Sequence, residues 1–429
     1  MIERMTAPFT SAECRASMRA LEDEIANYAE LLVCDGVAIK PGQELVVNAP
    51  VEAYEFARLV VKAGYEAGAG HVTVIWGDER ISRLEYENLP REYFETVPAW
   101  KRDQLNTLAE NGAAFLFLSG EDPSALKGID PAKPATALRA RNMQCRAFRD
   151  GMDFGRNAWC IGGVPVAAWA RQVFPDVSEE EALYRLWAAI LRASRADGED
   201  PHGEWETHNA AFEKNKRQLN GMHFESLHYT SSNGTDLIVG LTDKHIWEGG
   251  AARTQDGTAF FPNIPTEEVF TSPDCRRAQG RVVSALPLVH NGLLVSDFWF
   301  EFKDGRVVDF GAERGASVLE EILETDDGAR RLGECAIISK NTPIRQSGLI
   351  FYNTLYDENA SCHLALGMGF PDCYEGGYEM TAEELAEKGV NKSHTHVDFM
   401  IGSDDLAITG ITADGKEVPF FINGQWAWE

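Results

Sequence analysis

The chain has 429 residues, more than one ordinary hydrophobic core needs and enough for two domains. Lys and Arg number 40 against 67 Asp and Glu, so the net charge of −27 would repel phosphate backbones and anionic membranes. The N-terminal segment lacks the apolar region of a secretory signal, and no stretch has the roughly 20 apolar residues of a membrane helix. The eight cysteines include no CxxC pair. We therefore expect a cytoplasmic protein with reduced thiols that binds neither nucleic acid nor membrane.

The first part of the chain alternates helical and strand-like patterns. Apolar residues recur at helical spacing over 11–31, 52–68 and 91–110, and apolar strands are predicted at 44–49, 71–77 and 113–120. Apolar strands separated by amphipathic helices indicate a largely parallel sheet covered on both faces. Gly64, Gly68 and Gly70 follow a helix and precede a strand, the reverse of a phosphate-binding loop, so they predict a helix stop and a turn.

A helical segment over 178–224 is predicted to bridge two domains, and the sequence pattern changes after it. Short strands are separated by turn signals at Asn233-Gly234, Asp256-Gly257, Asn291-Gly292 and Asp304-Gly305. Two helices are predicted here, at 314–333 and 357–368. We predict an N-terminal α/β domain at 1–205 and an α+β domain with a curved, mostly antiparallel sheet at 206–429.

The C-terminal segment SHTHVDFMIG (393–402) contains the clearest ligand pattern. Its β-branched and aromatic residues indicate a strand, in which the side chains of His394, His396 and Asp398 would share one face. Imidazole beside carboxylate suits zinc, cobalt, manganese or iron. The alternative is a polar strand face with an ordinary surface histidine.

Three further segments supply candidate ligands. His363 lies in NASCHLALGMG, which reads as a helix, and Glu267 and Glu268 stand between prolines in NIPTEEVFTSP. Glu334 comes just before an apolar run in GARRLGECAII. Each of these residues alone is compatible with a purely structural role. With one histidine from each of the two histidine segments and one carboxylate from each of the three acidic segments, the segments offer two imidazoles and three carboxylates, a set that two metal ions roughly 3.5–4 Å apart can share.

The same segments resemble the thermophilic metalloprotease family of aminopeptidases, the group of aminopeptidases S, T and II. The resemblance covers nearly the whole chain and rests above all on four motifs: PTEEVF (265–270), GARRLGE (328–334), SCHLALG (361–367) and HVDFM (396–400). It implies an N-terminal α/β domain, a C-terminal catalytic domain and a homodimer that acts on peptides. It also implies two divalent metal ions per chain (zinc, cobalt, manganese or magnesium), held by Glu268, Glu334, His363, His396 and Asp398.

The implied activity is that of a metallo-aminopeptidase, a hydrolase that removes N-terminal residues from peptides with water activated by two metals. Glu268 is assigned as the ligand because it keeps the family spacing to the later ligands, although Glu267 could be the ligand instead. With Glu268 as the ligand, its neighbour Glu267 is the expected general base. Family members usually have a tyrosine seven residues after the histidine of SCHLALG, where this chain has Phe370. Either the role of that hydroxyl is dispensable, or Tyr374 supplies it, or the activity is altered. His394 has no counterpart in the family motif.

Two other functions fit parts of this pattern. His363, His396 and Asp398 also form a two-histidine, one-carboxylate set, which is typical of mononuclear non-haem iron enzymes such as a ring-cleaving dioxygenase. Glu268 and Glu334 argue against that function, because a single iron needs open positions rather than further carboxylates. Phe370 motivates the other alternative, a non-catalytic protein that binds peptides or metal.

Overall fold

The computed structural model describes residues 9–290 and 293–429, so the predicted turn at Asn291-Gly292 lies outside the described residues. The chain forms two compact units. Unit 1 comprises Met1–Thr207, Ala251–Thr266 and Ile350–Leu355, and unit 2 comprises His208–Gly250, Glu267–Leu349 and Tyr356–Glu429. No helix within the described ranges combines the length and apolar character needed to cross a bilayer. The division into two domains at residue 205 stays a prediction.

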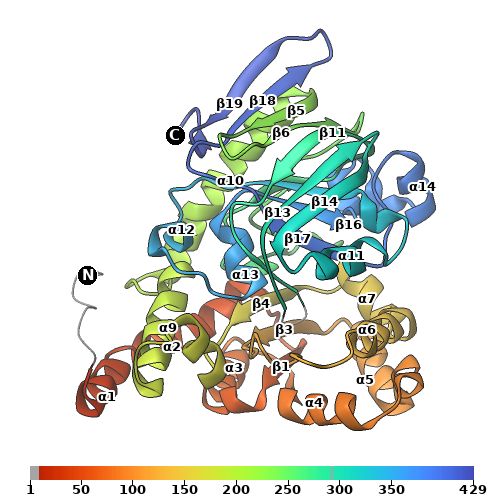
Figure 1. Cartoon of the computed structure of the whole chain (residues 1–429). Helices are drawn as coiled ribbons and strands as arrows, with labels where there is room; N and C mark the ends of the chain where they lie inside the picture. Colours follow the sequence, from red (N-terminus) through yellow and green to blue (C-terminus); the bar gives the residue numbers. More distant parts are fainter. Residues whose placement is uncertain (1–8, 291–292) are drawn as a thin grey trace. The chain divides into compact units, whose positions relative to one another are not determined.

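Unit 1 is built on a parallel sheet with strand order β2-β1-β3-β4-β9, of which β1, β3 and β4 are labelled in Figure 1. Its strands are β1 (Glu44–Pro50), β2 (His71–Gly77), β3 (Ala114–Ser119), β4 (Trp159–Gly163) and β9 (Asn263–Ile264). Leu45, Val46 and Val47 are consecutive and fully buried, because both faces of the inner strand β1 are covered. The predicted α/β class of the N-terminal part is therefore confirmed.

The helices of unit 1 follow the predicted pattern with local breaks. They are α1 (Ser11–Ala20), α2 (Glu22–Leu31), α3 (Tyr54–Glu66), α4 (Glu79–Asn88), α5 (Ala99–Glu110), α6 (Ala132–Gln144), α7 (Arg146–Asp153), α8 (Ala167–Val173) and α9 (Glu179–Ala193). The helix predicted over 91–110 is interrupted, because Pro98 cannot continue a hydrogen-bonded turn. Gly68 has φ +95° just after α3, so the predicted helix stop is confirmed.

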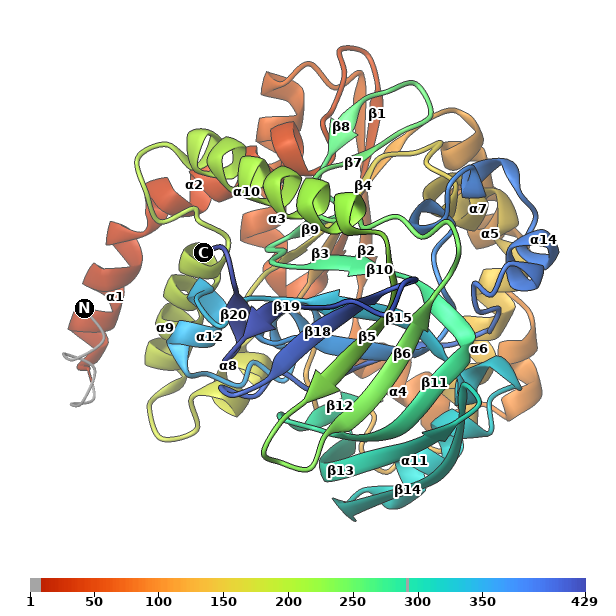
Figure 2. The same ribbon diagram turned by 90° about the horizontal axis from the view of Figure 1, so that it is seen from above.

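Unit 2 contains a large antiparallel sheet, seen from above in Figure 2. Its strand order is β12-β13-β11-β6-β5-β18-β19-β20, with β14 paired to β13. The strands are β5 (Phe224–Thr230), β6 (Asp236–Leu241), β11 (Pro273–Val283), β12 (Leu288–His290), β13 (Leu293–Lys303), β14 (Arg306–Arg314), β18 (Ala407–Thr412), β19 (Glu417–Ile422) and β20 (Gln425–Trp426). Gly234 and Gly305 have positive φ in the predicted turns, as a tight hairpin requires.

A second, four-stranded antiparallel sheet has the order β10-β15-β16-β17. Its strands are β10 (Val269–Thr271), β15 (Leu332–Ile337), β16 (His363–Gly367) and β17 (His396–Met400). The apolar face of this small sheet packs in one hydrophobic core with the large sheet, where the rings of Phe300 and Phe399 lie 5.1 Å apart. Helices α10 (Pro201–Met222), α11 (Ala316–Leu323), α12 (Pro343–Ser347), α13 (Thr354–Asp357) and α14 (Ala382–Glu387) complete this part of the chain.

Both helix predictions for this region need correction. The helix predicted at 357–368 is α13 and a short 3-10 turn followed by strand β16, so His363 lies on a strand. All five residues of β16 are buried, and a short apolar run that is buried on every side gives the same pattern in a helix and in a strand. The helix predicted at 314–333 ends at Leu323, and Glu334 lies within β15 rather than before a strand.

Candidate metal centre

One face of the small sheet gathers the predicted ligands, because alternate side chains of a strand point to opposite faces. In β17, His396 and Asp398 alternate with the buried Val397 and Phe399. The neighbouring strands follow the same division: Leu364 and Cys335 lie in the core, so His363 and Glu334 point to the other face. Ala365, with its small side chain, sits between Glu334 and Asp398 in the register.

A β-bulge at Gly333 decides where Glu334 points. Leu332 pairs with Leu366 and Glu334 pairs with Ala365, so one extra residue is inserted in β15 between the two pairs. Without this insertion Glu334 would share a face with the core residue Leu332. A Cβ at Gly333 would lie 2.3 Å from the carbonyl oxygens of Gly367 and Met368, so the bulge requires glycine.

His363 is held with its Nε2 toward the carboxylates. Its Nδ1 lies 3.1 Å from the carbonyl oxygen of Glu358 and 3.2 Å from that of Ser361. Because a carbonyl only accepts hydrogen bonds, Nδ1 is the donor. Nε2 then faces Glu268 Oε2 at 3.2 Å and Asp398 Oδ1 at 4.0 Å.

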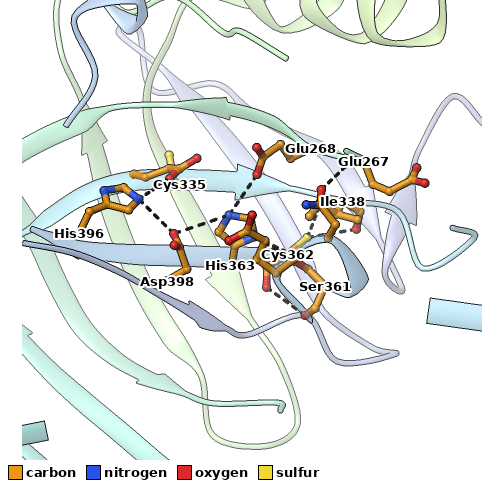
Figure 3. A network of polar contacts seen from close by, with 12 residues as sticks. Glu267, Glu268, Cys335, Ile338, Ser361, Cys362, His363, His396 and Asp398 are labelled. Carbon is orange, nitrogen blue, oxygen red and sulfur yellow. Dashed lines mark hydrogen bonds and ion pairs between the residues drawn. The ribbon is translucent and has the colours of Figure 1, made fainter. Parts of the chain in front are cut away.

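His396 is oriented in the same way. Its Nδ1 donates to the carbonyl oxygen of Met368 at 2.8 Å, and its Nε2 lies 3.1 Å from Glu334 Oε2 and 3.2 Å from Asp398 Oδ1. A backbone acceptor on one ring nitrogen is the usual support for a histidine that binds metal through the other. Figure 3 shows Asp398 between the two imidazoles and Glu268 directed at His363.

The donor atoms fall into two triads. Glu268, Glu334 and His363 offer ligand atoms within 4.8 Å of one another, and so do Glu334, His396 and Asp398. Glu334 belongs to both triads. Imidazole nitrogen and carboxylate oxygen together suit zinc, cobalt or manganese.

Electrostatics show that this cluster holds excess negative charge. Burial, and secondarily the charges of Asp398 and Glu268, raise the pKa of Glu358 well above its usual range. Burial raises the pKa of Glu334 too, with a further contribution from Glu268. Burial alone would lower the pKa of His363, but Glu268 and the other carboxylates raise it well above its usual value. A divalent cation among these groups would compensate the like charges.

The remaining predicted residues lie in different surroundings. Glu267 points away from the imidazoles in Figure 3; its carboxylate is 3.6 Å from His208 Nε2, and its backbone N–H donates to Asn359. His394 is exposed and precedes β17, so it does not join the face that carries His396 and Asp398. Tyr374 donates its hydroxyl to Asp243 at 3.0 Å.

Phe370, which stands where a tyrosine was expected from the resemblance, does lie beside the cluster. Its ring is tilted over the imidazole of His396, with 4.9 Å between the ring centroids. A phenyl ring there supports the imidazole by packing but offers no hydrogen-bond donor.

Residues 21–426 match a protein family described as thermophilic metalloprotease (M29). The chain belongs to this family. Aminopeptidase 2 of Geobacillus stearothermophilus is 46% identical over 412 residues, which is 96% of this chain and 100% of that relative. Aminopeptidase AmpS of Bacillus subtilis (strain 168) is 43% identical, with 96% and 100% covered. The structure of wild-type AmpT from Thermus thermophilus superposes with a TM-score of 0.88 at 38% identity, covering 95% of this chain and 100% of that one.

Membership of the thermophilic metalloprotease family confirms the resemblance seen in the sequence. It also confirms the fold class and the class of enzyme, a metallo-aminopeptidase that hydrolyses peptide bonds. Use of a divalent metal follows from the same membership. The five ligands and the role of Glu267 stay predictions.

Two residues of this metalloprotease site were missed by sequence reasoning. Glu358 was read as part of a helix, although an acid five residues before a candidate ligand histidine was a usable signal. Gly333 fell at the end of the helix predicted over 314–333 and was given no role. Its position directly before Glu334 has meaning only once the pairing of β15 with β16 is known.

The bulge can be tested with Gly333→Ala. The added Cβ would displace the carbonyl oxygens of Gly367 and Met368, and the latter orients His396. We expect metal content and peptidase activity to fall at least about tenfold, since outer-shell contacts of metal ligands are commonly worth that much. The matched control is Gly221→Ala, where a Cβ meets no atom within 4 Å. Unchanged metal content and activity in Gly333→Ala would contradict this role of the bulge.

Metal binding should release protons. The raised pKa values of His363 and His396 keep both protonated near neutral pH in the metal-free chain, whereas a ligand imidazole must be neutral. These raised values stabilise the metal-free fold fully below the unfolded pKa of about 6.5, and the effect is lost as pH rises through the folded pKa. Metal affinity should therefore increase with pH.

Calorimetry of metal binding at pH 7 in buffers of different ionisation enthalpy measures this release. We expect roughly one to two protons per chain. His394→Gln, at an exposed residue outside the cluster, should release the same number. A binding heat that does not depend on the buffer would rule out protonated imidazoles.

Proposed function

We propose that this metalloprotease removes N-terminal residues from peptides with two divalent metal ions held by Glu268, Glu334, His363, His396 and Asp398. The observation that supports two ions rather than one is the pair of donor triads that share Glu334. One triad contains His363 and the other His396, so each ion would have its own imidazole.

Bound divalent cations would supply a water of lowered pKa and polarise the scissile carbonyl. The chain's own residues prepare the site for them. The carbonyl oxygens of Glu358 and Met368 fix the imidazole tautomers, so both Nε2 atoms face the carboxylates. Asp398 lies against both rings, and His396 and His363 hold its pKa below the usual value although burial would raise it.

A carboxylate outside the ligand set is needed to accept a proton from water and pass it to the leaving amine. Glu267 is the residue predicted from the sequence, and its neighbour in the chain is the ligand Glu268. Glu358 is a second candidate, because the nearby charges of Asp398 and Glu268 help to raise the pKa of its carboxyl group.

We also propose the cellular compartment, the oligomeric state, the metals and the catalytic domain of this enzyme. All eight cysteines are free, as expected in the reducing cytoplasm. Ile81 and Leu84 on α4 are each 56% exposed, and exposed apolar side chains of this kind are compatible with a homodimer interface. Zinc, cobalt, manganese and magnesium stay open as the native metal, and peptides are the expected substrates. We retain the C-terminal part, residues 206–429, as the catalytic domain.

The two other functions considered from the sequence are not favoured. A mononuclear iron dioxygenase would use His363, His396 and Asp398 and leave Glu268 and Glu334 without a role, although both face these residues. A non-catalytic binding protein was motivated by Phe370. The family and the aminopeptidase relatives support an enzyme instead.

The two-metal proposal predicts a specific effect of Glu334→Gln. Removing the charge of the shared carboxylate should lower metal content by one equivalent and hydrolysis of leucine anilide by at least about a hundredfold, with the fold retained. Metal analysis and activity are measured on the same preparation. Glu417→Gln, at an exposed residue of β19, should leave both unchanged. Unaltered metal content and activity in Glu334→Gln would contradict the ligand set.

Glu267→Gln and Glu358→Gln distinguish the two candidate bases. Loss of the base should lower kcat by about 10²- to 10⁴-fold while both metal equivalents remain bound. The acidic limb of the pH–rate profile should also disappear in that variant only. Full kcat in both variants would place the base on another residue.

A further inference from the structure

Two partly exposed phenyl rings lie next to each other, and one of them contacts the proposed ligand His396. Phe270 lies on β10 between the buried residues Val269 and Thr271, so its side chain leaves the core on the face that carries the ligands. The ring of Phe370 contacts that of Phe270 edge-on at 5.7 Å and is tilted over His396 at 4.9 Å. We call Phe270 and Phe370 the phenyl wall.

The phenyl wall is held in place by the backbone. Phe270 exchanges two backbone hydrogen bonds of 2.9 Å with Glu248, and the N–H of Phe370 donates to Ser272 Oγ at 2.7 Å. The large core of unit 2 includes neither ring, whereas it includes Val269 next to Phe270. Rigid aromatic side chains that stay partly exposed beside a catalytic centre are typical of a ligand-binding wall.

We propose that the phenyl wall is the subsite for the N-terminal side chain of the peptide and selects large apolar residues. This inference rests on the proposed function. In an N-terminal residue the side chain leaves Cα, the atom bonded to the scissile carbonyl carbon. When that carbonyl is at the metal ions, the side chain must lie within a few ångströms of the imidazoles, and the phenyl wall begins at His396.

The charged groups nearby favour an apolar over a basic side chain. Glu248, opposite Phe270, already contacts Lys216 at 3.2 Å. Asp372 follows Phe370 by two residues, and burial, helped by the charge of Glu248, raises the pKa of its carboxyl to about 7. Neither carboxylate is an uncompensated exposed charge, so a lysine or arginine side chain would gain little there.

Kinetics with alanine, leucine, phenylalanine and arginine p-nitroanilides test the subsite. The wild type should prefer leucine and phenylalanine over alanine and arginine. Phe270→Ala should lower kcat/KM for leucine and phenylalanine about tenfold relative to alanine, mainly through KM, since contacts of this size in an apolar pocket discriminate 10- to 200-fold. Metal content should not change, because the ring of Phe270 packs against that of Phe370 rather than against one of the proposed ligands.

Two further variants guard against a purely structural effect. Phe370→Leu keeps an apolar side chain against His396 and should retain most leucine activity, whereas Phe370→Ala should lose it. Ile422→Ala, at a residue of β19 that is 42% exposed, is the apolar control. An equal fall for all four substrates, or a wild type that prefers arginine, would overturn the subsite while the peptidase function stands. Absence of turnover with any anilide would overturn the proposed function, and the subsite with it.

Discussion

The four-stranded sheet of unit 2 has one face in the hydrophobic core and one face that carries the candidate ligands. This is possible because alternate side chains of a strand point to opposite faces. One face completes the hydrophobic core through Cys335, Leu364 and Phe399. The opposite face presents acids and imidazoles that would be costly in that core. The core residues thereby fix the register, because a slip of one residue would bury the charges and expose the apolar set. Stability of the fold and geometry of the site depend on the same pairing.

Collecting these groups works against the stability of the metal-free chain. Glu334 is 4% exposed and His363 is 1% exposed, and withdrawing such ions from water costs on the order of several kcal/mol each unless they are compensated. Imidazoles between the carboxylates compensate part of this charge. The raised pKa of Glu358 shows that burial and neighbouring acids still disfavour its ionised form. Folding brings these carboxylates close together, and bound cations would reduce the repulsion between their negative charges.

The sequence identified the types of residue in the candidate site better than it predicted their positions in the fold. Alternation in HVDFM correctly placed His396 and Asp398 on one face, because a half-buried strand has a clear period. SCHLALG gave no such signal, since β16 is buried on every side. Glu334 points to the site through an inserted residue at Gly333, and a bulge depends on the partner strand rather than on local pattern. Glu358 is near His363 in the sequence, but the charges of Asp398 and Glu268 that act on it come from distant segments and depend on the tertiary fold.

The central claim is that two cations share Glu334, with one imidazole on each. Anomalous diffraction from crystals grown with zinc or manganese tests this directly. We predict two anomalous peaks per chain roughly 3.5–4 Å apart. One should lie beside His363 and Glu268, the other beside His396 and Asp398, with Glu334 between them. A single peak on His363, His396 and Asp398, with Glu268 and Glu334 turned away, would contradict the account.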